Sequence, residues 1–177
     1  PDAQMAERVP PLWVAGRQTV ERDLEQSHIV FGLPAKAATA HDRFALMTLS
    51  TLYGGGMSSR LFQQVREQRG LCYSIFSFAS LYSDSGVFSV YAGTSASQAN
   101  EMLAVAAEEL AGIAHSVHPD EVTRAKAQLR ASLLMSRESV SNCGDALARQ
   151  IMLFGVPQDD AMLVAAIDDV DENAVRN

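Results

Sequence analysis

The alternation of hydrophobic and polar positions divides the chain into strand-like and helix-like segments. Residues 27–33 form a short apolar run that ends before Pro34, which is typical of a buried strand. Residues 41–53 place apolar side chains at helical spacing, and the three glycines that follow cannot continue a helix interior. A second, short helix with a serine cap is expected to run up to Gly70 with its apolar side chains inward.

The middle of the chain reads as a hairpin followed by helices. Residues 71–81 and 86–94 are strand-like runs rich in aromatic and β-branched side chains, and the polar residues between them are typical of a hairpin turn. Helical spacing then returns, and Ser95 with Gln98 predicts a capping box at its start. Three further helices are expected in the last third of the chain, over residues 119–135, 139–154 and 162–167.

This order of elements predicts an α+β fold, in which an antiparallel β-sheet is covered by α-helices in two layers. A tight hairpin makes its strands antiparallel, which argues against a doubly wound parallel sheet. We interpret residues 1–17 as a linker or edge segment, with a short edge strand at 12–15, and residues 18–177 as a single domain. Residues 171–175 resemble an N-cap and a first helical turn. We therefore expect the chain to be truncated at its C-terminus, as a piece of a longer protein.

Composition and charge narrow the range of partners. The chain has 177 residues, of which 47% are hydrophobic, and its formal net charge is -7. This hydrophobic content excludes overall disorder, and the acidic balance argues against a nucleic-acid partner. No apolar run approaches the ~20 residues of a membrane span. The two cysteines cannot form a disulfide framework, and free thiols are typical of a reducing compartment. For the compartment of the parent protein we favour the cytoplasm, with the periplasm as the alternative.

Metal and nucleophile motifs are missing from the sequence. Neither H-E-x-x-H nor H-x-x-E-H occurs. His115 and His118 are three residues apart with no evident third ligand, so we interpret them as solvent-exposed. Cys72 and Cys143 have no neighbouring histidine, and we interpret them as buried structural cysteines.

Three consecutive glycines, Gly54, Gly55 and Gly56, precede the serine cap of the short helix. A glycine loop at a helix N-terminus is typical of an anion site, but this one lacks the G-x-x-x-x-G-K-[ST] pattern and follows a helix. It can instead be a helix C-cap with a tight turn, or a backbone that an extended peptide approaches closely. The residues alone do not separate these two interpretations.

Arg66 and Tyr73 form a candidate pair around Gly70. Arg66 lies in the last turn of the short helix and Tyr73 at the start of the next strand, and Gly70 reverses the chain between them. Each has a purely structural explanation: an arginine stabilises the negative end of a helix dipole, and a tyrosine packs on a half-buried sheet. The alternative is a joint functional role for the guanidinium and the phenol.

Two long segments carry a family resemblance. LYGGGMSSRLF (52–62) and VREQRGLCYS (65–74), with further matches at 23–28, 84–88 and 124–129, resemble the pitrilysin and mitochondrial processing peptidase family of inverted-motif zinc metallopeptidases. The resemblance extends from about Gln18 onward. In that family two homologous α+β domains face each other across a peptide-holding chamber. The first carries H-x-x-E-H, and this chain resembles the second, which typically lacks zinc.

The resemblance implies a role for the candidate residues. Arg66 and Tyr73 match, in type and spacing, a pair that contacts substrate near the scissile bond. Gly54–Gly56 correspond in position to a longer, substrate-contacting glycine-rich loop. The zinc would be bound by a missing N-terminal domain or a partner chain and not by this fragment, which is expected to be inactive alone.

The function implied is that of a substrate-binding, cleft-completing domain of a zinc endopeptidase. Its substrate would be a peptide or an unfolded polypeptide held between two halves. The alternative is a non-catalytic scaffold or partner subunit of the same family. An intact H-x-x-E-H upstream in the parent protein would favour the enzyme.

Overall fold

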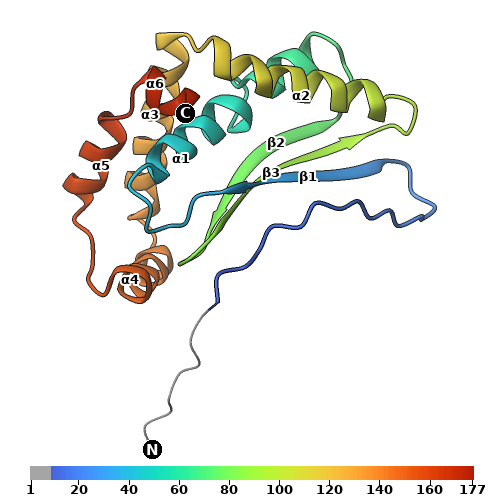
Figure 1. Ribbon diagram of the computed structural model, residues 1–177. Helices are drawn as coiled ribbons and strands as arrows, with labels where there is room; N and C mark the ends of the chain where they lie inside the picture. Colours follow the sequence, from blue (N-terminus) through green and yellow to red (C-terminus); the bar gives the residue numbers. More distant parts are fainter. Residues whose placement is uncertain (1–8) are drawn as a thin grey trace, which may run out of the picture.

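The computed structural model describes residues 9–177 and has the two-layer α+β architecture that the sequence predicts. Three antiparallel strands lie in the order β1-β3-β2, and the helices cover one face of the sheet (Figure 1). The elements are β1 (Ser27–Ala35), α1 (Arg43–Gly54), the π-helix η1 (Phe62–Glu67), β2 (Ser74–Leu81), β3 (Gly86–Thr94), α2 (Ala99–His115), α3 (Pro119–Ser136), α4 (Val140–Phe154), α5 (Asp160–Asp168) and α6 (Glu172–Arg176).

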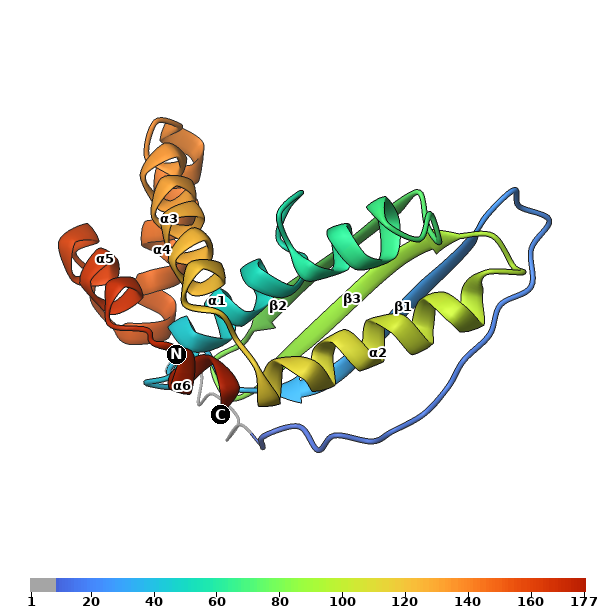
Figure 2. The ribbon, with the colours of Figure 1, turned by 90° about the horizontal axis from the view of Figure 1, so that it is seen from above.

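The helices fall into two groups relative to the sheet. Seen from above, α1, η1 and α2 run along the sheet, whereas α3 to α6 gather beyond one of its ends (Figure 2). That end is where β1 finishes and β3 begins, since Ala35 pairs with Gly86. At the opposite end, Ser74 of β2 pairs with Gly93, next to the end of η1. One end of the sheet therefore lies beside α3 to α6, and the other end lies beside η1.

The first strand differs from its prediction in length and in burial. β1 continues through Pro34, which pairs with Val87, and Val30 is exposed. The proline is tolerated because β1 is at the edge of the described sheet, and Val30 is exposed because it lies on the face away from the helices, two residues from His28. On the face away from the helices, the His28 Nδ1 atom lies 2.8 Å from the Tyr91 hydroxyl. His28 is thus a surface residue.

The core lies between the sheet and the helices above it. Phe88, Val90 and Ala92, at every second position of β3, are all buried, whereas Val87 and Tyr91 are only half-buried. Tyr53 of α1 is fully buried, and its hydroxyl donates a 2.6 Å hydrogen bond to the Ala106 carbonyl of α2. Burial, with the nearby negative charge of Glu109, raises the pKa of this phenol. The hydrogen bond joins the two helices that cover the sheet.

The capping box predicted at Ser95 is wrong. Ser95 Oγ donates to Gln98 Oε1 at 2.9 Å, and α2 begins only after Gln98, without a side-chain cap. The backbone first forms a turn, with Gln98 N donating to the Ser95 carbonyl, so the serine lies too far upstream to cap the helix. A capping box occurs instead at the start of α3, between His118 and Glu121.

The N-terminal end of the described chain has no helix or strand, whereas the C-terminal end is helical. Residues 9–24 form no helix or strand, so the edge strand expected at 12–15 is not formed. This segment lies beyond β1 rather than in the sheet (Figure 1). At the other end, Asp171 caps α6 by accepting a hydrogen bond from Ala174 N, as its sequence predicts. None of the helices within residues 9–177 combines the length and apolar content needed to cross a bilayer.

Candidate functional site

A tight turn holds Arg66 and Tyr73 on its two sides. The backbone N–H of Gly70 donates to the Arg66 carbonyl at 3.1 Å, and that of Leu71 donates to the Val65 carbonyl at 2.9 Å. Gly70 adopts φ +60, a left-handed conformation that favours glycine. The buried side chains of Val65 and Leu71 anchor the turn in the core. Its geometry is therefore set by the backbone and not by the two candidate side chains.

Both candidate side chains point their polar groups away from the core. Arg66 is exposed and its guanidinium lies over the Phe62 ring, 4.7 Å from the ring centroid. Tyr73 is 68% exposed, although its backbone N–H donates to Gly93 in β3. Within residues 9–177, no hydrogen bond or ion pair engages the guanidinium or the phenol. The structure thus leaves two donors available to a ligand at one end of the sheet.

Phe62 contacts the Arg66 side chain, although the sequence pattern predicts that its ring points into the core. It is only half-buried, and one helical turn separates it from Arg66. A guanidinium over an aromatic face is held by a cation–π interaction, which orients the side chain without using its N–H donors. The i, i+4 spacing of an aromatic and an arginine was the signal available in the sequence.

The cysteine between the pair is not an activated nucleophile. Cys72 is buried, and burial raises the pKa of its thiol, against the opposing effect of the positive charge of Arg66. A raised pKa keeps the thiol protonated at neutral pH. Cys143 is half-buried rather than buried, and its Sγ lies 3.2 Å from the Arg137 carbonyl. The predicted burial is thus confirmed for Cys72 and wrong for Cys143.

The three glycines lie at the other end of η1 from Arg66, and neighbouring elements occupy their surroundings. A Cβ on Gly54 would lie 2.4 Å from the Ser77 backbone nitrogen, so glycine lets α1 approach β2 closely. A Cβ on Gly55 would lie 2.6 Å from Thr51 Cα, and the Gly55 carbonyl accepts a 2.7 Å bond from Gln128 Nε2. Packing thus accounts for Gly54 and Gly55 without a ligand.

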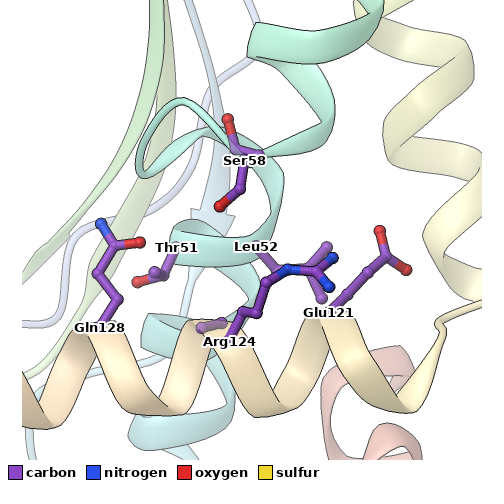
Figure 3. A pocket seen from close by; sticks show the side chains of 8 residues that line it. Thr51, Leu52, Ser58, Glu121, Arg124 and Gln128 are labelled. Atoms are coloured by element: carbon purple, nitrogen blue, oxygen red, sulfur yellow. The ribbon is translucent and has the colours of Figure 1, made fainter.

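A small polar crevice separates this loop from α3 (Figure 3). Thr51 and Ser58 line it on one side, and Arg124 and Gln128 on the other. Its volume is about 10 Å³, which is about the space that one water molecule needs. The crevice therefore does not support the anion site that a glycine loop and an arginine would otherwise suggest.

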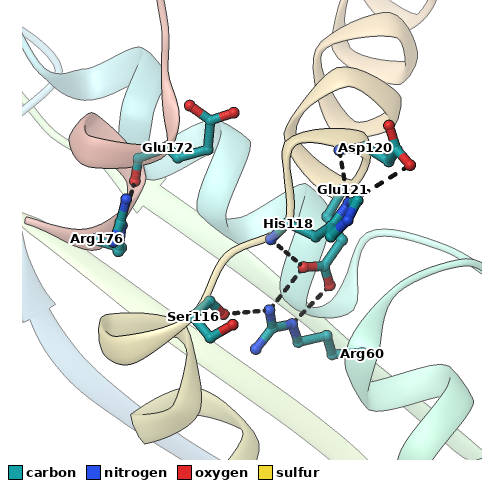
Figure 4. A network of polar contacts seen from close by, with 7 residues as sticks. All are labelled: Arg60, Ser116, His118, Asp120, Glu121, Glu172 and Arg176. Carbon is teal, nitrogen blue, oxygen red and sulfur yellow. Dashed lines mark hydrogen bonds and ion pairs between the residues drawn. The ribbon is translucent and has the colours of Figure 1, made fainter.

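An ion pair of low exposure fixes the start of η1 to the helical layer (Figure 4). Arg60 donates to both carboxylate oxygens of Glu121, at 2.8 and 2.7 Å, and to the Ser116 carbonyl at 2.7 Å. The two side chains are only 16% and 20% exposed. The hydrogen bonds from Arg60 lower the pKa of Glu121, and burial opposes them. This pair joins residues 61 positions apart and connects η1 to the capping box of α3.

Replacing Glu121 by glutamine should destabilise the fold by about 2 kcal/mol at neutral pH, because it leaves the Arg60 charge without its partner. The folded pKa of Glu121 is depressed, so the stabilisation is present above the unfolded pKa of about 4.3 and is lost as pH falls through the folded value. Urea unfolding at pH 7 and pH 3 measures both effects. Asp168→Asn, in the more exposed pair with Arg130, should cost at most about 1 kcal/mol. If Glu121→Gln and Asp168→Asn lost equal free energy of unfolding, the conclusion that Arg60 depends on Glu121 to balance its charge would be wrong.

An apolar groove of about 450 Å³ lies at the end of the sheet away from the Gly70 turn. Leu33 of β1, Leu46 and Leu49 of α1, and Leu110 of α2 are among its lining residues. Leu33 pairs with Phe88, whereas Tyr73 lies next to the Ser74–Gly93 pair. About five residues of β3 separate these positions, or ~17 Å along the strand. The groove is therefore separate from the Arg66–Tyr73 turn.

The described residues do not fit a metal. Within residues 9–177, no group of three or more His, Cys, Asp or Glu side chains is arranged to hold an ion. His115 and His118 are both exposed, as the sequence predicts, and the His118 ring accepts a hydrogen bond from Asp120 N. Its role in the structure is to cap α3 (Figure 4).

Comparison with known proteins identifies relatives along most of the chain. Residues 6–129 match the family model described as the peptidase M16 inactive domain. An uncharacterized zinc protease of Streptomyces coelicolor is 38% identical over 172 residues, covering 92% of this chain and 38% of that protein. An uncharacterized zinc protease of Rickettsia felis is 34% identical, covering 87% of this chain and 38% of that protein. The chain thus spans about two fifths of the length of these curated relatives.

The fold also occurs in solved structures. A chain of complex III2 from Candida albicans superposes with a TM-score of 0.81 at 19% identity, covering 88% of this chain and 40% of that chain. At this level of identity the likeness shows the fold alone, and one fold serves different functions.

Proposed function

This chain belongs to the peptidase M16 inactive domain family, and we propose that it is the substrate-binding, cleft-completing half of a zinc-dependent endopeptidase. The observation that carries the proposal is the pair of exposed donors, Arg66 and Tyr73, on the two sides of the anchored Gly70 turn. The zinc would belong to the other half, because the described residues of this chain offer no ligand set. The substrate would be a peptide or an unfolded polypeptide held between the two halves.

The two side chains suit the charge changes of peptide hydrolysis. Negative charge develops on the scissile carbonyl oxygen as the peptide bond is attacked. The Tyr73 hydroxyl can donate one hydrogen bond to that oxygen or to a neighbouring peptide group. The Arg66 guanidinium offers several donors and a permanent positive charge. The backbone hydrogen bonds of the turn fix where the two side chains leave the chain, which supports a site that needs little backbone movement when substrate binds.

Glycine packing supports a structural role for the loop that precedes η1. Gly54 lies against β2, and the Gly55 carbonyl is bonded by Gln128. Gly56 is half-buried, and a Cβ there would lie 3.3 Å from the Gln128 amide nitrogen. We therefore assign the substrate contacts of this half to Arg66 and Tyr73 and the turn to Gly54–Gly56.

The test uses the full-length protein with and without its metal. We expect it to cleave an unstructured peptide, to lose this activity in a chelator, and to regain it when zinc is added back. A protein that binds no zinc and cleaves nothing, alone or with its natural partner chain, would instead be a scaffold subunit. Zinc content by mass spectrometry and peptide cleavage by chromatography separate these outcomes.

A further inference from the structure

Helix α4 has one row of side chains that the rest of the described chain partly covers and a second, apolar row that it leaves exposed. The partly covered row consists of Cys143, Ala146, Gln150, Leu153 and Phe154. Beside them lies a second row, which we call the α4 seam, made of Val140, Gly144, Leu147 and Ile151. Val140, Leu147 and Ile151 are 88%, 42% and 50% exposed. The steps of four, three and four residues keep the row within a sector of about 60° on an ideal helix.

This spacing is that of a helix–helix contact. Apolar residues that alternate steps of three and four form the seam along which two helices pack against each other. The charged residues of α4, Asp145 and Arg149, lie on the other side of the helix. Interface cores are depleted of charge in the same way. The seam thus has the composition of an interface and not that of a solvated helix face.

Gly144 indicates that the missing neighbour is a helix at close range. A Cβ at this position would meet nothing within 4 Å, so no contact inside the described chain requires glycine. Glycine in a helix interior is less favourable than alanine, so the stability of α4 itself gives no reason for a glycine at position 144. A residue without a side chain in the middle of an apolar row lets a second helix backbone approach closely.

We propose that the α4 seam docks an apolar helix of the zinc-bearing half of the same protein. The inference rests on the proposed function, which supplies that half. The relatives extend well beyond the matched region, since this chain covers only 38% of their length. A half on the same polypeptide is present at an effective concentration of about millimolar, well above that of a second copy in dilute solution. The seam lies on α4, in the group of helices beyond the end of the sheet opposite the Gly70 turn (Figure 2).

The experiment places the photoreactive residue p-benzoylphenylalanine at position 151 of the full-length protein. After irradiation, we expect an intramolecular cross-link to a peptide of the zinc-bearing half. The matched control places the same residue at Met152, which is exposed but lies off the seam. The yield at position 151 should exceed that at 152 about tenfold, because only the seam is in contact with the other half. Cross-links to a second copy, or equal yields at the two positions, would overturn the proposal.

A second variant tests the role of Gly144. Gly144 is exposed, an added Cβ there meets nothing within 4 Å, and leucine has a higher helix propensity than glycine, so α4 in Gly144→Leu should remain helical by circular dichroism. Its side chain would separate the two helices, and the cross-link from position 151 should fall about tenfold. Asp145→Leu adds the same side chain on the charged side and should leave the yield unchanged. An unchanged yield in Gly144→Leu would contradict the docking.

Peptide cleavage distinguishes failure of this inference from failure of the proposed function. Cleavage by the full-length protein without a cross-link at position 151 would reject the docked helix and keep the peptidase. A cross-link to the other half without any cleavage would keep the interface and favour the scaffold subunit.

Discussion

Replacing Tyr73 by phenylalanine in the full-length protein should lower kcat for peptide cleavage about 100-fold, the size of effect seen when one positioned donor is removed from a transition state. The unfolding temperature should not change. The phenol is largely exposed and its hydroxyl makes no hydrogen bond within residues 9–177, so the folded state loses nothing when it is removed. Steady-state kinetics at saturating peptide, together with thermal unfolding, measure the two quantities separately.

Tyr82→Phe is the matched control for this prediction. Tyr82 is also exposed, and it lies at the hairpin between β2 and β3, at the other end of the sheet. Its side chain cannot reach a ligand held at the Gly70 turn, so the variant should keep the wild-type kcat. A wild-type kcat in Tyr73→Phe, or equal losses in the two variants, would remove Tyr73 from the proposed site.

The split between kcat and KM also reports what Tyr73 does. If the hydroxyl binds the substrate and the transition state equally, its removal should raise KM and leave kcat unchanged. If the hydroxyl interacts only with the charge that develops in the transition state, its removal should lower kcat and leave KM unchanged. We expect the second result, because the proposed role of the Tyr73 hydroxyl is to donate to the carbonyl oxygen as negative charge develops on it.

Local pattern predicted those parts of the fold that depend on near neighbours in sequence. The alternation of β3 and the polar turn before it define the hairpin, and the glycine at position 70 marks the reversal of the chain. These features arise from side-chain period and backbone conformation within a few residues. For the same reason the sequence places Arg66 and Tyr73 on the two sides of one turn without any knowledge of the sheet.

Features that depend on distant residues could not be predicted in the same way. Whether β1 is an edge strand depends on the order of the strands, and only that order permits Pro34 inside it. The Arg60–Glu121 pair joins residues 61 positions apart, and no local pattern signals it. The availability of the Arg66 guanidinium depends on Phe62 lying beneath it rather than in the core. In each case tertiary packing decides what a local propensity leaves open.

Replacing Gly54 by alanine should destabilise the protein by about 3 kcal/mol, a large overpacking penalty. The new Cβ would lie 2.4 Å from the Ser77 backbone nitrogen and 2.6 Å from its Oγ. Ser77 cannot move aside freely, because it is buried in β2 and its hydroxyl donates a 2.7 Å hydrogen bond to the Ser50 carbonyl of α1. The change must therefore separate α1 from the sheet. Urea unfolding of the variant and the wild type measures the loss.

Gly56→Ala is the matched control, and it also separates the two interpretations of the glycine loop. Its Cβ would lie 3.3 Å from the Gln128 amide nitrogen, the far end of a flexible side chain, so the cost should stay below about 1 kcal/mol. If the loop only turns the chain, Gly56→Ala keeps the wild-type KM. If a peptide approaches the loop backbone, KM rises although stability does not change, and the substrate contacts extend to the glycines. Gly54→Ala cannot make this distinction, because it lowers activity through the folded fraction whichever interpretation holds.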